Sequence, residues 1–165
     1  MVLSKQTIQR LFNAQKIKIA PFDQSLLGDC SYNLQLDDIA VYPDTGDEKR
    51  LGKDFHLLPG EFVLINTKEY IELPNYLIGH ISSRSSTARL GLLVDFGAEL
   101  IQPGHVGKIC LEIKNLSAKP VLLQPGLSIA QVYFEFIDSE EQGEGNPYQN
   151  DEKPELSRLC QEIKM

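Results

Sequence analysis

The chain has 165 residues, a net charge of −7 and 42% hydrophobic residues, which is the size and composition of one globular domain. No apolar run approaches the roughly 18 residues of a membrane span, and the first residues lack the apolar core of a secretion signal. The acidic balance disfavours duplex nucleic acid as a partner, because neutralising phosphates requires a basic face.

The acidity is concentrated near the C-terminus. Residues 138–155 hold seven acids and one base, whereas residues 1–137 have a net charge of only −2. The 138–155 segment is polar and has no aliphatic side chain. We therefore predict one domain over residues 1–137, followed by an acidic, flexible arm over residues 138–165.

Cysteine and histidine usage argues against disulfide bonds and bound zinc. Cys30, Cys110 and Cys160 form no CxxC pair, and the three histidines are scattered without an HExxH or HxE…PCxxC motif. We expect a reducing, cytoplasmic setting and no metal held by the protein itself.

The first predicted element is a short helix over residues 4–15. Ser4 is a suitable N-cap, and Ile8, Leu11 and Phe12 follow at the spacing of one helical face. We expect this face to pack against the rest of the domain.

From about residue 30 the sequence changes to short β-type runs separated by turns. Strands are expected at residues 31–36, 61–66, 76–81, 91–96, 108–115, 120–124 and 127–137, and a polar loop at 44–54. Pro-Gly pairs at 59–60, 103–104 and 125–126 mark turns. Since no long amphipathic helix lies between these runs, we predict an all-β sandwich or barrel.

The segment SSRSSTARLGL, residues 82–92, is the first candidate site. Its serines suit a helix N-cap, and residues 87–90 are compatible with one helical turn. Free N–H groups at such a turn, together with Arg84 and Arg89, would suit a phosphate group. A solvated serine-rich turn with surface arginines remains the alternative.

The strand predicted at 108–115 contains a second candidate site. Alternation directs Ile109, Leu111 and Ile113 to one face, and Cys110, Glu112 and Lys114 to the other. A carboxylate in mid-strand is usually a solvated surface group. If its face looks into a cleft, it becomes a candidate general acid and base.

These segments together resemble the dCTP deaminase branch of the dUTPase-like superfamily. The resemblance is carried by SSRSSTARLGL, by AELIQPGHVGKICLEIKN and by QPGLSIAQVYF, and the first residues and YQNDEKPELSRL near the end also match. It implies a distorted β-barrel or jelly-roll of the dUTPase-like type, with a short N-terminal helix and one helical turn after SSRSS. It further implies a homotrimer with active sites at the subunit interfaces.

The implied activity is hydrolytic deamination of dCTP to dUTP and ammonia in pyrimidine deoxynucleotide metabolism. No protein-bound zinc is implied, and Mg²⁺ is expected only with the nucleotide phosphates. Glu112 matches the glutamate that activates water, Ser85 a stabilising hydrogen-bond donor, Arg89 an arginine near the base, and Ala98 a backbone group that holds the water. The implied substrate-binding residues are Arg84, Ser85, Ser86, Arg89, Gln102, Cys110, Leu111, Glu112, Tyr148 and Gln149.

The sequence departs from the family pattern at some of these positions. Gln102 replaces an acid that lies at the sugar and, in relatives that cleave dUTP, positions the attacking water. Since an amide cannot act as a base, this argues against dUTP diphosphatase activity, alone or combined with deamination. In the arm, Pro147 replaces a lysine and Asp151 a glutamine. A nucleotide-binding relative that is not catalytic, or has altered specificity, remains the alternative to a deaminase.

Overall fold

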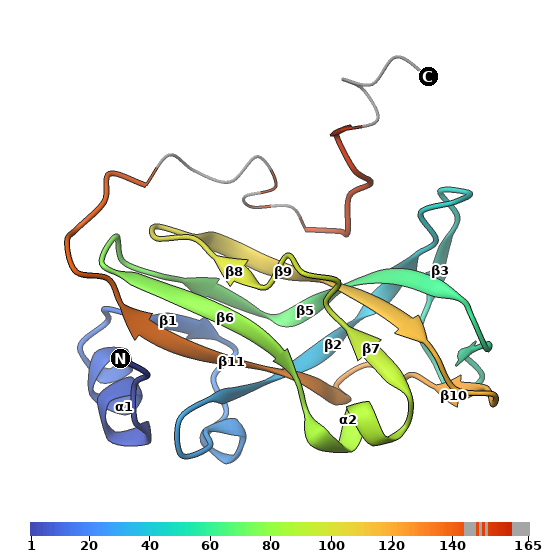
Figure 1. Cartoon of the computed structure of the whole chain (residues 1–165), viewed down its shortest axis with the longest axis horizontal. Coiled ribbons are helices and arrows are strands. Elements are labelled where there is room, and N and C mark those ends of the chain that lie inside the picture. The colour runs from blue at the N-terminus through green and yellow to red at the C-terminus, as the bar shows by residue number, and fades with distance from the viewer. Residues whose placement is uncertain (144–147, 149, 151, 160–165) are drawn as a thin grey trace.

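The computed structural model describes residues 1–143, 148, 150 and 152–159. It confirms the all-β prediction, because the helical elements are short and strands make up most of the fold (Figure 1). The helical elements are α1 (Lys5–Asn13), a 3₁₀ turn η1 (Gln24–Leu26) and α2 (Ser85–Arg89). The strands are β1 (Lys18–Ala20), β2 (Tyr32–Val41), β3 (Glu48–Arg50), β4 (His56–Leu57), β5 (Phe62–Glu72), β6 (Leu77–Ser83), β7 (Leu92–Val94), β8 (Leu100–Ile101), β9 (Val106–Asn115), β10 (Val121–Leu122) and β11 (Ser128–Phe136).

The N-terminal helix forms as the sequence predicts. The Ser4 side chain accepts a hydrogen bond from the backbone N–H of Thr7, which satisfies one free donor at the helix start. Ile8 is fully buried, and the ring of Phe12 stacks on that of Phe22 with 3.9 Å between ring centroids. The helix is therefore held to the domain by its apolar face.

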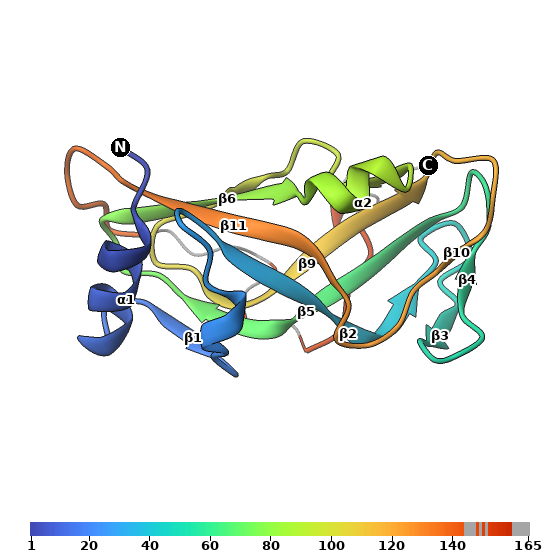
Figure 2. The same cartoon turned by 90° about the horizontal axis from the view of Figure 1, so that it is seen from below.

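The main sheet is antiparallel and curled. Its strand order is β7-β9-β5-β2-β11-β6-β8, with β1 added beside β5 and β3 beside β2, while β4 and β10 form a separate pair. Figure 2 shows α1 and the β4–β10 pair at opposite ends of the curled sheet. The two edge strands β7 and β8 are joined by the short loop 95–99, so the curl brings the two edges together.

The core fills the concave side of this curl. Strand alternation supplies it, as in β2, where Tyr32, Leu34 and Leu36 are fully buried while the residues between them are half-buried. Full burial of an aliphatic side chain such as Leu34 or Leu36 contributes about 1.5–3 kcal/mol. None of the helices in the described residues combines the length and the apolar character that crossing a membrane requires.

The structure corrects several sequence-based boundaries. β2 and β5 extend well beyond their predicted ends, and β1, β4 and β8 were not predicted. β3 lies inside the segment predicted to be a polar loop and pairs with residues 39–41 of β2. Its three residues are all exposed, so only main-chain pairing, and no apolar pattern, makes it a strand.

A helical turn forms here, but it begins at Ser85, two residues before the predicted start at residue 87, and it is capped differently. The predicted serine caps are absent from it: Arg84 occupies the N-cap position, and no side chain makes the capping hydrogen bond. Gly91 follows the helix with φ +80°, a conformation that glycine adopts without steric cost.

Candidate functional site

A pocket of about 370 Å³ lies between the β5–β9 part of the sheet and the β6–β8 edge. This volume falls in the range of small-molecule sites. The pocket is lined by Pro43, Phe62, Leu64, Asn66, Ile81, Ala98, Leu100, Ile101, His105, Lys108, Ile109, Cys110, Glu112, Tyr148, Lys153, Glu155 and Ser157. Its walls are mostly apolar, and its polar groups come from three separate parts of the chain.

Strand β9 supplies the first set of polar side chains. Lys108, Cys110 and Glu112 alternate along one face and all line the pocket, as the predicted alternation requires. Leu111 and Ile113 point to the opposite face and are buried in the core. Leu111 can therefore meet a pocket ligand only through its backbone.

The loop between β7 and β8 holds the Glu112 carboxylate. Phe96 donates its backbone N–H to Glu112 Oε2 at 3.2 Å, and Asp95 donates its own to the Glu112 carbonyl at 2.9 Å. The Asp95 carboxylate in turn accepts the backbone N–H groups of Gly97 and Ala98 at 3.1 and 2.9 Å. Because the Ala98 N–H is engaged in this way, its carbonyl is the backbone group that could hold a water molecule.

The other end of the pocket is also polar. Asn66 and His105 line it and are buried, and Lys108 donates to Asp37 Oδ2 at 2.5 Å. His105 Nε2 lies 3.3 Å from the Gly107 carbonyl, and burial lowers the pKa of His105. Since a carbonyl only accepts, this contact assigns the proton of the neutral ring to Nε2.

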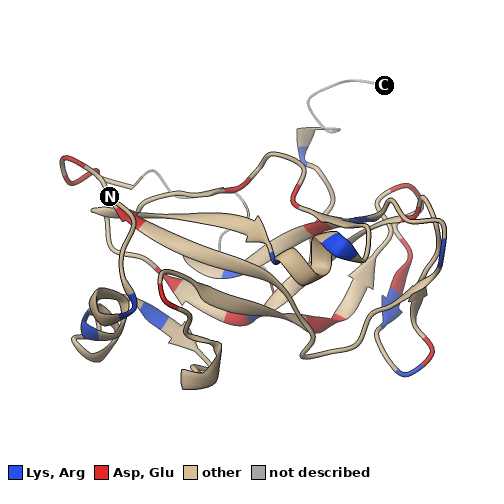
Figure 3. Ribbon diagram, turned by 60° about the horizontal axis from the view of Figure 1, so that its bottom comes forward, with Lys and Arg blue, Asp and Glu red and all other residues tan. Residues whose placement is uncertain are grey.

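The predicted phosphate turn lies outside this pocket. Arg84, Ser85, Ser86 and Arg89 belong to α2 and its N-cap and do not line the cavity that contains Glu112. Figure 3 shows basic colour on this short helix. Arg84 is half-buried and donates from Nη1 to the Ser128 carbonyl at 2.8 Å, whereas the other three side chains are exposed. Within one chain, the two predicted halves of the site are not brought together.

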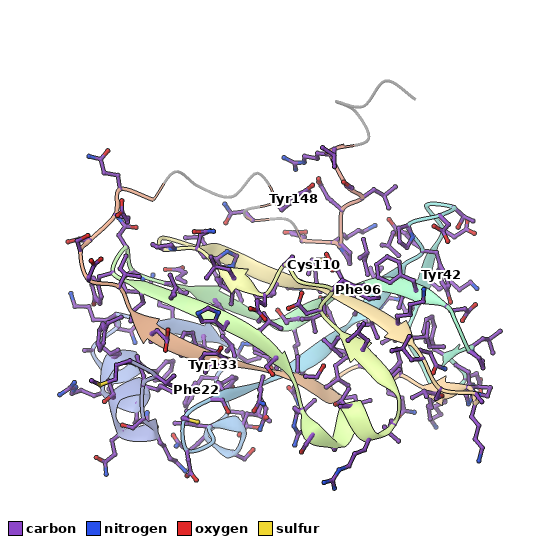
Figure 4. All side chains as sticks on the ribbon, viewed as in Figure 1. Phe22, Tyr42, Phe96, Cys110, Tyr133 and Tyr148 are labelled. Carbon is purple, nitrogen blue, oxygen red and sulfur yellow. The ribbon has the colours of Figure 1, made fainter. Side chains whose placement is uncertain are left out.

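The C-terminal segment contributes several pocket residues. Tyr148, Lys153, Glu155 and Ser157 line the cavity, and Lys153 forms an ion pair with Glu48 of β3 at 2.9 Å. Figure 4 shows Tyr148 over the side of the sheet that carries Cys110 and Phe96. Gln149, Pro147 and Asp151, which were singled out in the sequence, lie outside the described residues.

Gln102 does not line the pocket either. Its side chain is exposed in the turn between β8 and β9, and its carbonyl accepts the His105 backbone N–H at 3.2 Å. The described residues contain no cluster of three or more His, Cys, Asp or Glu side chains suited to a metal ion.

Sequence reasoning missed Asp95 beside the pocket and six polar residues that line it: Asn66, His105, Lys108, Lys153, Glu155 and Ser157. The alternation of β9 could have included Lys108, which is two residues before Cys110 on the same face. Asp95 stands two residues before Gly97, and an aspartate near a glycine is a common signal for a loop in which a carboxylate binds the following N–H groups. Nothing local in the sequence places Asn66 or His105 in the pocket, because that depends on the curl of the sheet.

Comparison with known proteins gives concordant matches. The family model described as dCTP deaminase-like matches residues 2–137. The chain is 34% identical to a dCTP deaminase of Thermomicrobium roseum, over 100% of this chain and 97% of the relative. It is 33% identical to a dUMP-forming dCTP deaminase of Dictyoglomus thermophilum, over 96% and 95% of the two chains.

Solved structures agree in fold. The dCTP deaminase of Agrobacterium tumefaciens superposes with a TM-score of 0.70 at 22% identity, over 82% of this chain, which spans about half (47%) of that chain's length. A dUTPase from phage phi11 of S. aureus superposes with a TM-score of 0.52 at 17% identity, over 78% of this chain and 95% of the other. The dUTPase-like fold that the sequence resemblance implies is thereby confirmed.

Proposed function

Since this chain belongs to the dCTP deaminase-like family, we propose that it hydrolyses the C4 amino group of dCTP, giving dUTP and ammonia. The observation that carries the proposal is the Glu112 carboxylate, which lines a largely apolar pocket and is held by the Phe96 N–H at 3.2 Å. The names of the relatives, matched over almost the whole chain, support the same substrate.

The proposed chemistry needs one group that takes a proton from water and returns it to the base. Glu112 fills this role: it removes a proton as the water oxygen attacks C4, and protonates N3 of the ring. Glu112 then carries the proton of the new C4 hydroxyl to the amino nitrogen. The C4–N bond breaks as the C4 carbonyl forms, so that dCTP and water become dUTP and ammonia. The Ala98 carbonyl would hold the water, and the backbone of residues 110–112 would meet the edge of the pyrimidine.

We further propose a homotrimer in which a neighbouring subunit supplies Ser85 and Arg89. Two observations support this arrangement. α2 lies outside the pocket of its own chain, and two large apolar side chains beside it are exposed: Leu90 directly after the helix by 57%, and Leu93 of the adjoining strand β7 by 36%. Such a patch is typical of a surface that another chain covers. Ser85 would then stabilise the tetrahedral centre, and Arg84 and Ser86 would bind phosphate.

The product is proposed to be dUTP rather than dUMP. Gln102 offers an amide where dUTP cleavage needs a base, although several relatives are named as dUMP-forming. Mg²⁺ would enter with the triphosphate, held by its oxygens and by water. Residues 138–165 are proposed to act as an arm whose Tyr148 and Gln149 contact the nucleotide. We also propose that the protein is cytoplasmic, which is the location expected for an enzyme that acts on a nucleotide.

The test is a turnover assay with dCTP and Mg²⁺ that measures ammonia, dUTP and pyrophosphate separately. We expect equal amounts of ammonia and dUTP, and pyrophosphate at background. Pyrophosphate released as fast as ammonia would show that the dUTP assignment is wrong. Binding of dCTP by calorimetry without any product would instead identify a nucleotide-binding protein without this activity.

Glu112→Gln tests the assigned role directly. Because an amide cannot accept the proton from water, we expect loss of at least about 10² in kcat with dCTP binding retained. Glu72→Gln is the matched control, since Glu72 pairs with Lys18 on the surface outside the pocket. A Glu112→Gln protein with normal kcat would exclude Glu112 as the catalytic group.

A further inference from the structure

Strand β5 loses its register with β9 beside the pocket. The two strands pair residue by residue from Phe62↔Lys114 to Asn66↔Cys110, and pairing resumes only at Tyr70↔Lys108. Residues 67–69 of β5 therefore stand opposite Ile109 alone. Bulges of this kind locally remove ladder hydrogen bonds and often lie next to functional sites, where they redirect side chains.

A second irregularity meets the first from the other side. β2 pairs with β5 at Leu36↔Thr67 and next at Ala40↔Ile65, so residues 37–39 of β2 stand opposite Asn66. Asn66 and Cys110 both line the pocket. The two irregularities thus flank the part of the sheet that forms the pocket wall.

Buried side chains replace the lost ladder bonds. Thr67 Oγ1 accepts the backbone N–H of Ile109 at 2.9 Å, and its hydroxyl donates to the Glu69 carbonyl at 2.7 Å. Glu69 Oε2 accepts the backbone N–H of Gln35 at 2.9 Å. Thr67 and Glu69 have no exposed surface, so these bonds do not compete with solvent.

The Thr67 hydroxyl is therefore linked directly to the pocket. Ile109, whose N–H it holds, lines the cavity, and so does Cys110, the next residue along β9. On the other side of Ile109, Lys108 is bound to Asp37 at 2.5 Å. A hydrogen bond to the backbone of one lining residue fixes the peptide groups that flank it, because consecutive residues share a planar peptide.

We propose that Thr67 is a positioning residue for the nucleotide: its hydroxyl sets the backbone of residues 109–111 against the edge of the bound base. This inference rests on the proposed function, since it takes the pocket to be the pyrimidine site. Thr67 touches no substrate and acts only through Ile109. Its removal should weaken binding of the base in ground state and transition state alike, and so raise KM more than it lowers kcat.

The experiment compares Thr67→Val with Thr67→Ser. Valine keeps the shape but leaves the Ile109 N–H without its acceptor, whereas serine retains the hydroxyl. We expect Thr67→Val to raise the Kd for dCTP and KM about tenfold, with kcat changed by less than about threefold, and Thr67→Ser to restore most of the affinity. Ile17→Val, a buried change outside the pocket, controls for loss of stability alone.

Binding is measured by calorimetry in the Glu112→Gln background, where turnover is expected to be at least about 10² slower. If Glu112→Gln alone binds neither dCTP nor dUTP, the proposed function fails. If it binds them and Thr67→Val binds equally well, or loses no more than Ile17→Val, the positioning role fails.

Should Thr67→Val not fold, Thr67→Ala takes its place in the comparison with serine. Amide exchange in the unaltered protein supplies a result that needs no variant. The Ile109 N–H should exchange as slowly as the paired amides of β9, and exchange at the rate of an exposed loop would contradict the Thr67 bridge.

Discussion

Glu69 places a carboxyl group in the interior of the sheet, where solvent cannot reach it. Burial raises its pKa, and the negative charge of Asp37 adds to this, while the Gln35 N–H and Lys68 act in the opposite direction. Oε1 has no hydrogen-bond partner among the described residues. Folding therefore shifts the balance of Glu69 toward its protonated form, compared with the unfolded chain.

This preference predicts how stability depends on pH. Between its ordinary pKa of 4.5 and its raised pKa in the folded protein, Glu69 binds more proton in the folded than in the unfolded state. Its contribution to the free energy of unfolding is thus fully present below pH 4.5 and is lost as pH rises through the folded pKa. Glu69→Gln, which stays neutral, should not lose stability in this window.

Urea unfolding across this pH range checks the prediction. The free energy of unfolding of Glu69→Gln minus that of the unaltered protein should rise with pH above 4.5 and then level off. Glu72→Gln, at an exposed ion pair, should show no comparable rise. A difference that stays constant with pH would mean that folding does not raise the pKa of Glu69.

At the scale of elements, the sequence predicts what depends on local pattern. The N-terminal helix follows from Ser4 and its apolar face, and β9 follows from alternation, which also puts Cys110 and Glu112 on one side. The short strands β3 and β8 could not be predicted in this way. They exist because a neighbouring strand offers main-chain partners, and their own residues have no alternating pattern.

The residues of the candidate site also fall into those that a local sequence pattern predicts and those that depend on the folded sheet. Glu112 stands out in the sequence because a mid-strand carboxylate is conspicuous, and the pocket confirms that its face is hollowed. Thr67 does not stand out, because its role arises from a register break between β5 and β9. Register depends on the packing of the whole sheet, which a single strand's sequence does not contain.

The turn between α2 and β7 restricts which residue can occupy position 91. Gly91 has φ +80°, and a Cβ there would lie 2.7 Å from Ser117 Cβ. Gly126 also has φ +80°, but a Cβ there would meet nothing within 4 Å. The two glycines thus share the backbone conformation and differ only in the space around them.

Alanine substitution should separate strain from crowding. We expect Gly126→Ala to lower the free energy of unfolding by about 1 kcal/mol, from the left-handed conformation alone. Gly91→Ala should cost about 2 kcal/mol more, because Ser117 and its backbone must also move. Urea unfolding measures the loss of stability of both variants. Equal losses would show that the turn at residues 115–119 shifts without an energetic penalty.

At the scale of the whole molecule, the pocket of one chain is only half of the proposed site. Glu112 and Ala98 line it, while Arg89 is exposed on α2 outside it. The charge of the chain divides similarly: residues 1–137 have a net charge of only −2, so two arginines at α2 can dominate locally. If a neighbour supplies α2, each site takes its carboxylate from one subunit and its arginine from the next.

Mixed oligomers test this division. Glu112→Gln and Arg89→Ala should each be inactive alone. Their co-expressed mixture should regain about a quarter of the unaltered activity, because in a random cyclic trimer about one site in four combines an intact carboxylate with an intact arginine from the neighbouring subunit. Co-expressed Ser85→Ala and Arg89→Ala should show no such gain, since both changes lie on the same side of the interface. Activity of the first mixture equal to the sum of its parts would place the whole site within one chain and overturn the interface arrangement.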